Sequence, residues 1–99
     1  MSTSSDPTTT STTTASTHQT TLVLPANLHA RPAGQLARAA AAFTSVVRLE
    51  HNGRTVNPTG VLAVMGLGAT AGTTVTVRAE GHDAEQAVTT LTQILATAE

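Results

Sequence analysis

The segment Asn27-Leu28-His29-Ala30-Arg31-Pro32-Ala33 combines residue types that suit phosphoryl chemistry. A neutral imidazole is a nucleophile that can accept a phosphoryl group, and the guanidinium of Arg31 can pair with phosphoryl oxygens. Pro32 is typical of the first turn of a helix, where its missing N–H costs nothing. His29 is therefore expected at or next to a helix N-cap, among unpaired N–H groups that favour an anion and disfavour imidazolium. A histidine that only caps the helix, or is merely exposed, fits these residues as well.

The helix that would position His29 is predicted from Ala30 to Phe43. Apolar residues recur there at the spacing of one helical face, at Ala33, Leu36, Ala37, Ala40 and Phe43. The alanine run at positions 39–42 favours a helix too. Before it, Thr21 to Leu24 predicts a short strand that Pro25 closes.

The rest of the chain predicts three more strands and a final helix. Residues 44–50 and 54–57 are expected to form a hairpin around Asn52-Gly53, a pair that suits a type I′ turn. Residues 73–79 alternate, with Val75, Val77 and Ala79 on one face. Asp83, three residues before Gln86, indicates a variant of the capping box. The last helix carries the apolar stripe Ala84, Ala87, Val88, Leu91, Leu95 and Ala98.

Periodicity alone does not decide whether Gly60 to Leu67 is a buried strand or a short helix, although Gly68 would suit a helix C-cap. The order of elements favours an α+β sandwich. Its helices are expected on one face of a four-stranded, mostly antiparallel sheet.

Composition excludes several classes of protein. The 99 residues carry a formal net charge of −1, one aromatic residue (Phe43) and no cysteine. The chain thus lacks the cationic excess and the aromatic platforms of nucleic-acid binding proteins, and it has no disulfide framework. His18, His51 and His82 have no recognisable metal-ligand spacing, and they are interpreted as exposed bystanders. Since no membrane span or secretory signal is evident, we expect a soluble cytoplasmic protein that needs no metal or cofactor.

The chain divides into two regions. Residues 1–20 contain 14 serines and threonines and almost nothing apolar, which predicts a disordered tail. Residues 21–99 have an ordinary globular composition, with five charges of each sign. Their apolar residues are rich in alanine, so the core is expected to combine small side chains with leucine and valine.

Four motifs together resemble the histidine-containing phosphocarrier protein HPr of the bacterial phosphoenolpyruvate:sugar phosphotransferase system. They are LHARPA at 28–33, the Asn52-Gly53 hairpin, VMGLGA at 64–69, and VTVRAEG at 75–81 before the last helix. The resemblance covers residues 21–99. It implies the open-faced β-sandwich of that family, in the order βαββαβα, and it makes residues 60–67 a short helix.

The resemblance also implies a function. His29 matches the histidine that is phosphorylated on its pros nitrogen, and Arg31 matches the arginine beside it. The phosphoryl group would come from enzyme I and pass to the A-components of enzyme II, so the protein would be a stoichiometric carrier, expected as a monomer, and not an enzyme. The implied partner-binding residues lie on the first and second helices: Ala30, Gly34, Arg38, Val61, Leu62 and Met65. We expect at least one of the last three to be exposed, because a short helix cannot bury every side.

One position departs from the family. Many members carry a regulatory serine at the start of the short helix, where this chain has Gly60 preceded by Thr59. We therefore expect no serine-based regulation here. Three other functions are alternatives: an HPr-like regulatory adaptor, a component of a dihydroxyacetone or nitrogen-related branch, and a small hydrolase. The last would need a second catalytic group, and none is evident near His29.

Overall fold

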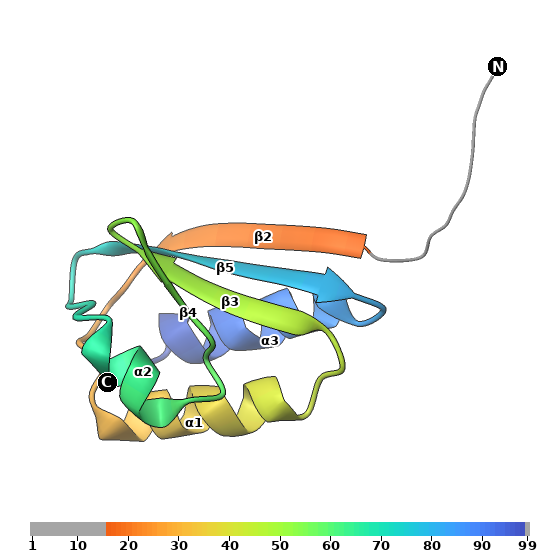
Figure 1. The fold of residues 1–99 in the computed structure, drawn as a ribbon. Coiled ribbons are helices and arrows are strands. Elements are labelled where there is room, and N and C mark those ends of the chain that lie inside the picture. Colours follow the sequence, from red (N-terminus) through yellow and green to blue (C-terminus); the bar gives the residue numbers. More distant parts are fainter. Residues whose placement is uncertain (1–15, 99) are drawn as a thin grey trace, which may run out of the picture.

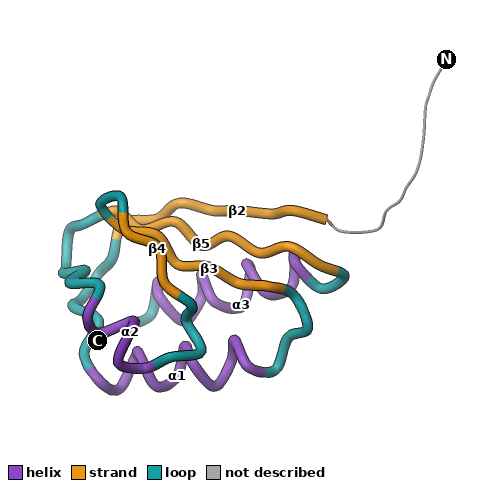
Figure 2. The backbone as a smooth tube through the Cα atoms, viewed as in Figure 1, coloured by secondary structure: helices purple, strands orange, loops and turns teal. Residues whose placement is uncertain are grey.

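Within residues 16–98, four antiparallel strands form one sheet, and helices pack on one of its faces (Figures 1 and 2). The computed structural model describes residues 16–98. Within them the elements are β2 (Ser16–Val23), α1 (Ala30–Ala41), β3 (Val46–His51), β4 (Arg54–Val56), α2 (Val61–Gly66), β5 (Thr74–Gly81) and α3 (Ala84–Ala96). The strand order is β2-β5-β3-β4, and every pairing is antiparallel. The predicted α+β architecture and the order βαββαβα are confirmed.

The core lies between the sheet and the helices. In β5 the alternation predicted from sequence holds, because Val75, Val77 and Ala79 are all at most 1% exposed. The apolar stripe of α3 is buried against β2 and β5, as predicted. Eight of the buried residues are alanines, so the close packing of small side chains is also as expected.

The first strand begins five residues earlier than the sequence predicts, at Ser16 instead of Thr21. Ser16 to Thr20, expected in the disordered tail, form the first part of β2 and pair in register with β5, from Ser16 opposite Gly81 onward. The pairing uses backbone groups, and threonine suits a half-exposed strand, so this edge needs few apolar side chains. The remaining part of the predicted tail, residues 1–15, lies outside the described residues.

Asp83 does not form the predicted capping box. It occupies the N-cap of α3, but its side chain makes no capping bond. Instead its carboxylate accepts hydrogen bonds from the N–H groups of Thr44 and Ser45, each at 2.9 Å, and from both hydroxyls. These donors, the Ser45 hydroxyl first and the Thr44 N–H next, lower the pKa of Asp83 to about 2. A carboxylate satisfied by four donors from another loop has no reason to turn back to its own helix.

The turn between β3 and β4 and the segment that forms α2 have the backbone conformations expected from their residue types. Asn52 and Gly53 have positive φ angles of 51° and 81°, as a type I′ turn requires. Residues 61–66 are helical, which settles the alternative that periodicity left open, and Gly68 follows the helix with φ 76°. No helix within residues 16–98 is long and apolar enough to cross a bilayer.

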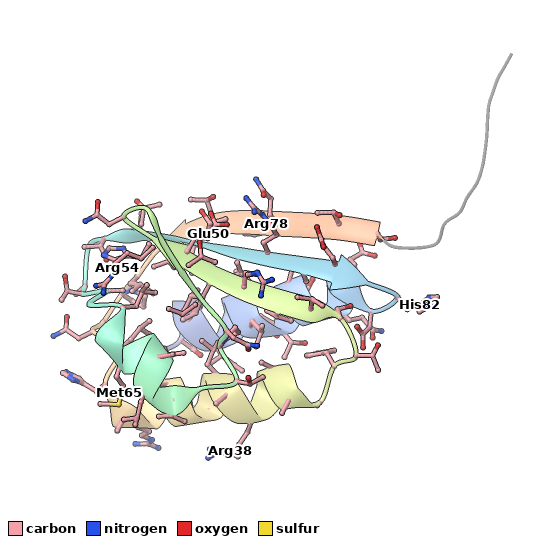
Figure 3. All side chains as sticks on the ribbon, viewed as in Figure 1. Arg38, Glu50, Arg54, Met65, Arg78 and His82 are labelled. Carbon is pink, nitrogen blue, oxygen red and sulfur yellow. The ribbon has the colours of Figure 1, made fainter. Side chains whose placement is uncertain are left out.

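The sheet face opposite the helices is mostly polar, although Val23 and Val46 are also exposed on it. Figure 3 shows Glu50 and Arg78 together on this face, and their side chains form an ion pair of 3.0 Å. The Nε–H of Arg78 also donates to Gln19 on β2 at 3.2 Å. These contacts link three neighbouring strands across the open face.

Candidate functional site

His29 is the N-cap residue of α1, as predicted from Pro32. Its backbone is extended, with φ −74° and ψ −177°. Leu28 on one side and Pro32 on the other are buried, whereas His29, Ala30 and Arg31 are exposed. Two buried anchors therefore hold a short exposed segment that carries both the imidazole and the guanidinium.

The start of α1 offers free hydrogen-bond donors beside His29. The carbonyl oxygen of His29 accepts the N–H of Ala33 at 3.0 Å, which closes the first helical turn. Pro32 has no N–H, and the hydrogen bonds of residues 16–98 include no acceptor for the N–H groups of Ala30 and Arg31. The His29 side chain makes no capping bond. An anion at this place would meet two backbone donors, the helix dipole and Arg31.

The segment that leads from β2 to His29 is hydrogen-bonded to the loop between α2 and β5. Residues 69–73, between α2 and β5, exchange backbone hydrogen bonds with Leu24 and Leu28: Leu24 N–H to Thr73 O at 2.9 Å, Gly72 N–H to Leu24 O at 2.8 Å, and Leu28 N–H to Ala69 O at 3.3 Å. The side chain of Asn27 adds a fourth bond, accepting the N–H of Ala71 at 2.8 Å. Asn27 has no role that the sequence predicts, because its partner is 44 positions away and no local pattern reveals it.

The partner-binding residues that the family resemblance implies on α1 form a stripe on one face of that helix. Ala30, Gly34 and Arg38 follow each other at four-residue intervals, so they lie on one helical face. Arg38 reaches back along this face, since a Cβ built on Gly34 would lie 3.7 Å from its Nη1. Figure 3 shows Arg38 directed away from the sheet. The stripe thus presents a guanidinium beside bare backbone.

The residues implied on the second helix are partly exposed, as predicted. Leu62 is 83% exposed and Met65 is 40% exposed, whereas Val61 packs partly on the core. Val64 on the same helix is fully buried and anchors it. Because α2 packs against α1, the exposed apolar side chains lie on the helix next to the Ala30–Arg38 stripe (Figures 1 and 3).

Gly60 is the N-cap residue of α2, with ordinary backbone angles of φ −97° and ψ 107°. A Cβ at this position would make only ordinary contacts, at 3.5 Å from the Cβ of Ala63 and 3.7 Å from the carbonyl oxygen of Asn57. The hydroxyl of the preceding Thr59 donates to Asn57 Oδ1 at 2.8 Å. The glycine is therefore not required by the backbone.

Sequence reasoning missed two neighbours of Arg31. A small cavity of about 90 Å³ is lined by Arg31, Pro32, Gln35, Thr97 and Ala98. Gln35 lies one turn along α1 from Arg31, so helical spacing could have indicated it. Thr97 comes from the far end of the chain, and no local signal points to it. His29 itself does not line this cavity.

The other histidines do not join His29. His82 is exposed, as expected, but His18 lies half-buried in β2 and His51 is also half-buried. The Nδ1 of His51 lies 3.2 Å from the carbonyl oxygen of Thr74, so this ring, at the end of β3, contacts the start of β5. Within residues 16–98, no three side chains of metal-binding type lie close enough to share an ion.

Comparisons with known proteins agree with this fold. Residues 16–97 match the sequence model of the family described as PTS HPr component phosphorylation site. The histidine-containing phosphocarrier protein of Mycoplasma is 30% identical, with a TM-score of 0.75 over 82% of this chain and 100% of that one. The phosphocarrier protein HPr of Bacillus anthracis is also 30% identical, with a TM-score of 0.75 over 80% and 96%. Crh, the catabolite repression HPr of Bacillus subtilis, is 32% identical, with a TM-score of 0.70 over 85% and 100%.

Proposed function

Because this chain belongs to the HPr family of phosphocarriers of the phosphotransferase system, we propose that His29 carries the phosphoryl group. In this proposal the protein accepts the group from phospho-enzyme I and passes it to an enzyme II A-component for sugar uptake, in the cytoplasm. The observation that supports it most directly is the exposed imidazole at the N-cap of α1, two residues from the guanidinium of Arg31.

The transfer needs few parts. A lone pair of the His29 imidazole forms the N–P bond, while the bond from phosphorus to the donor atom of enzyme I breaks and the donor keeps its electron pair. The transferred oxygens carry negative charge throughout. The N–H groups of Ala30 and Arg31, together with the Arg31 guanidinium, stabilise this charge without a metal ion. In the second transfer an acceptor atom of the enzyme II A-component forms the new bond to phosphorus, while the N–P bond breaks and the His29 nitrogen keeps its electron pair.

Docking is assigned to the adjoining helices. The exposed side chains of Leu62 and Met65 supply apolar contact area, and Arg38 supplies a positive charge near the rim. A small apolar centre with charge beside it suits partners that must bind briefly and then release. The carrier is proposed to act as a monomer, since both partners use the same face.

A labelling experiment tests the proposal. Phosphoenolpyruvate and enzyme I should label the protein with an acid-labile phosphate, and His29→Ala should abolish this labelling. The matched control is His82→Ala, which changes an exposed histidine at the other end of the sheet (Figure 3) and should label like the parent. Equal labelling of His29→Ala and the parent would refute the assignment. Arg31→Ala should slow transfer and leave the unfolding midpoint nearly unchanged, because Arg31 is exposed.

A regulatory adaptor is the second candidate, and the likeness to Crh favours it. An adaptor would bind its partner equally well with and without His29, since no phosphoryl transfer is involved. Partner binding that is tight and insensitive to His29→Ala, combined with absence of labelling, would support the adaptor. The pairing of His29 with Arg31 at an exposed helix start supports the carrier.

A further inference from the structure

We propose that Asn27 is a positioning residue for phosphoryl transfer at His29, acting through its side-chain hydrogen bond to the loop that follows α2. This inference rests on the proposed function of His29. Asn27 precedes His29 by two residues, and neither the sequence motifs nor the family match assigns it a role.

Both polar ends of Asn27 fix the backbone just before His29. Its carbonyl oxygen accepts the N–H of His29 at 3.0 Å, and its side-chain Oδ1 accepts the N–H of Ala71 at 2.8 Å. The first bond ties His29 to Asn27, and the second ties Asn27 to the 69–73 loop. Together they connect the His29 backbone to a loop that is distant in sequence.

The imidazole depends on this backbone for its placement. Among residues 16–98, no side chain or carbonyl group makes a hydrogen bond to the His29 ring. Many histidines that react are oriented by a bond to the second ring nitrogen, and such a bond fixes the ring directly. Here the N-cap backbone sets the point from which the ring projects. A shift at Asn27 therefore moves the reacting nitrogen relative to the N–H groups of Ala30 and Arg31.

Asn27 makes the one side-chain bond among the four that join the two loops. The other three are backbone bonds, so they persist when side chains are replaced. Removing the Asn27 amide should thus loosen the segment before His29 without separating the loops. Because Leu28 and Pro32 remain buried, the helix and its docking face should stay in place.

The expected effect is a change in rate without a change in docking. One neutral hydrogen bond makes a modest net contribution, and misplacement of a reacting group lowers the rate of the chemical step. We expect Asn27→Ala to lower the maximal rate of transfer from phospho-enzyme I by about three- to tenfold. The KM for phospho-enzyme I should stay at the parent value, since Leu62 and Met65 are unchanged.

The matched control is Thr73→Val, in the same loop. Thr73 donates its hydroxyl to Thr70 O at 2.6 Å and accepts the Thr70 N–H at 3.2 Å, so the variant loses side-chain bonds within the loop. Its backbone bond to Leu24 remains. Transfer rates of the parent, Asn27→Ala and Thr73→Val are compared well below the unfolding midpoints, and exchange of the Ala71 amide is followed by NMR.

The inference is supported if Asn27→Ala lowers the maximal rate at constant KM and exposes the Ala71 amide to exchange, while Thr73→Val transfers like the parent. It is overturned if Asn27→Ala transfers at the parent rate, if KM rises instead, if the Ala71 amide keeps its protection, or if both variants slow equally. A parent that accepts no phosphate, or a His29→Ala variant that does, would refute the proposed function instead. The two failures are therefore distinguishable.

Discussion

Replacing Gly81 with alanine should destabilise the fold far more than the same change at Gly53. Gly81 ends β5 with φ 145°, a value that alanine rarely adopts. A Cβ there would lie 2.5 Å from Ser45 Oγ and 2.8 Å from Ser45 Cα. The new methyl group thus meets both a side chain and the backbone of the neighbouring loop.

Ser45 has little freedom to move away. It is only 9% exposed, and both its N–H and its hydroxyl donate to the carboxylate of Asp83. Moving Ser45 would therefore stretch the bonds that hold the loop before β3 to the loop before α3. The collision should be relieved mainly by distorting the end of β5.

The magnitude has two parts. The unfavourable φ costs about 1–3 kcal/mol, and overpacking against a fixed neighbour costs about another 1–3 kcal/mol. The total cost, about 2–6 kcal/mol, is a large share of the free energy of unfolding of a typical domain, which is roughly 5–15 kcal/mol. At Gly53 only the backbone part remains, about 1–2 kcal/mol, because φ is 81° and a Cβ there would have no atom within 4 Å.

Urea unfolding and thermal melts of the two variants measure the difference. Each kcal/mol of lost stability lowers the thermal unfolding midpoint of a domain of this size by about 4–8 °C. The Gly81→Ala variant should therefore show at least about twice the drop in midpoint that Gly53→Ala shows, or it should fail to fold. Equal losses at the two positions would show that contact with Ser45 is unimportant and would refute this reasoning.

Three further results are expected. Asp83→Asn should be less stable than the parent at neutral pH, and this difference in stability should shrink as pH falls. The ionised carboxylate of Asp83 stabilises the fold above its ordinary pKa of 3.8, and this stabilisation is lost as pH falls toward the folded pKa of about 2. Urea midpoints from pH 7 to pH 2 test this, and a difference that stays constant with pH would contradict it. Gly60→Ser should raise the free energy of unfolding by about 0.5–1 kcal/mol, because serine caps helices well and restricts the unfolded chain; a loss of stability in urea would count against the space assigned to its Cβ. Leu62→Ser should leave stability within about 0.5 kcal/mol of the parent while weakening partner binding in calorimetry, whereas Val64→Ala, at a buried position of the same helix, should cost about 2 kcal/mol or more.

Local patterns predicted most of the fold. The apolar stripes of α1 and α3 and the alternation of β5 are set by which face each residue buries, so they can be seen in the sequence. The hairpin turn was predictable because the positive φ angles of Asn52 and Gly53 are a property of these residues themselves.

Long-range contacts account for the errors at the start of β2 and at Asp83. The start of β2 depends on backbone pairing with β5, and its side chains carry almost no apolar signal. Asp83 has a residue type and spacing that suit a cap, but donors from Thr44 and Ser45 compete successfully for its carboxylate. Neither competition is visible to a method that considers one segment at a time.

The candidate site followed from residue types in one part and from resemblance in the other. Pro32 placed the N-cap, and the exposure of His29 and Arg31 agrees with the predicted chemistry. The docking residues came from the family resemblance, and the exposure of Leu62 is compatible with that role. The contacts of Asn27 with Ala71 and the place of Thr97 beside Arg31 join segments that are far apart in sequence, so only the folded structure reveals them.

The position of β2 in the sheet has a consequence for synthesis of the chain. Among residues 16–98, β2 is an edge strand that pairs only with β5, with Ser16 opposite Gly81 and Val23 opposite Thr74. As the ribosome extends the chain, β2 emerges long before β5, its partner among residues 16–98, which follows only after most of the domain. The hairpin of β3 and β4 can form early, whereas closure of the sheet waits for a slow encounter between distant segments. During that interval the backbone groups of β2 that will pair with β5 lack this partner. They are then open to pairing with nascent chains on neighbouring ribosomes, so correct folding requires β5 to reach β2 first.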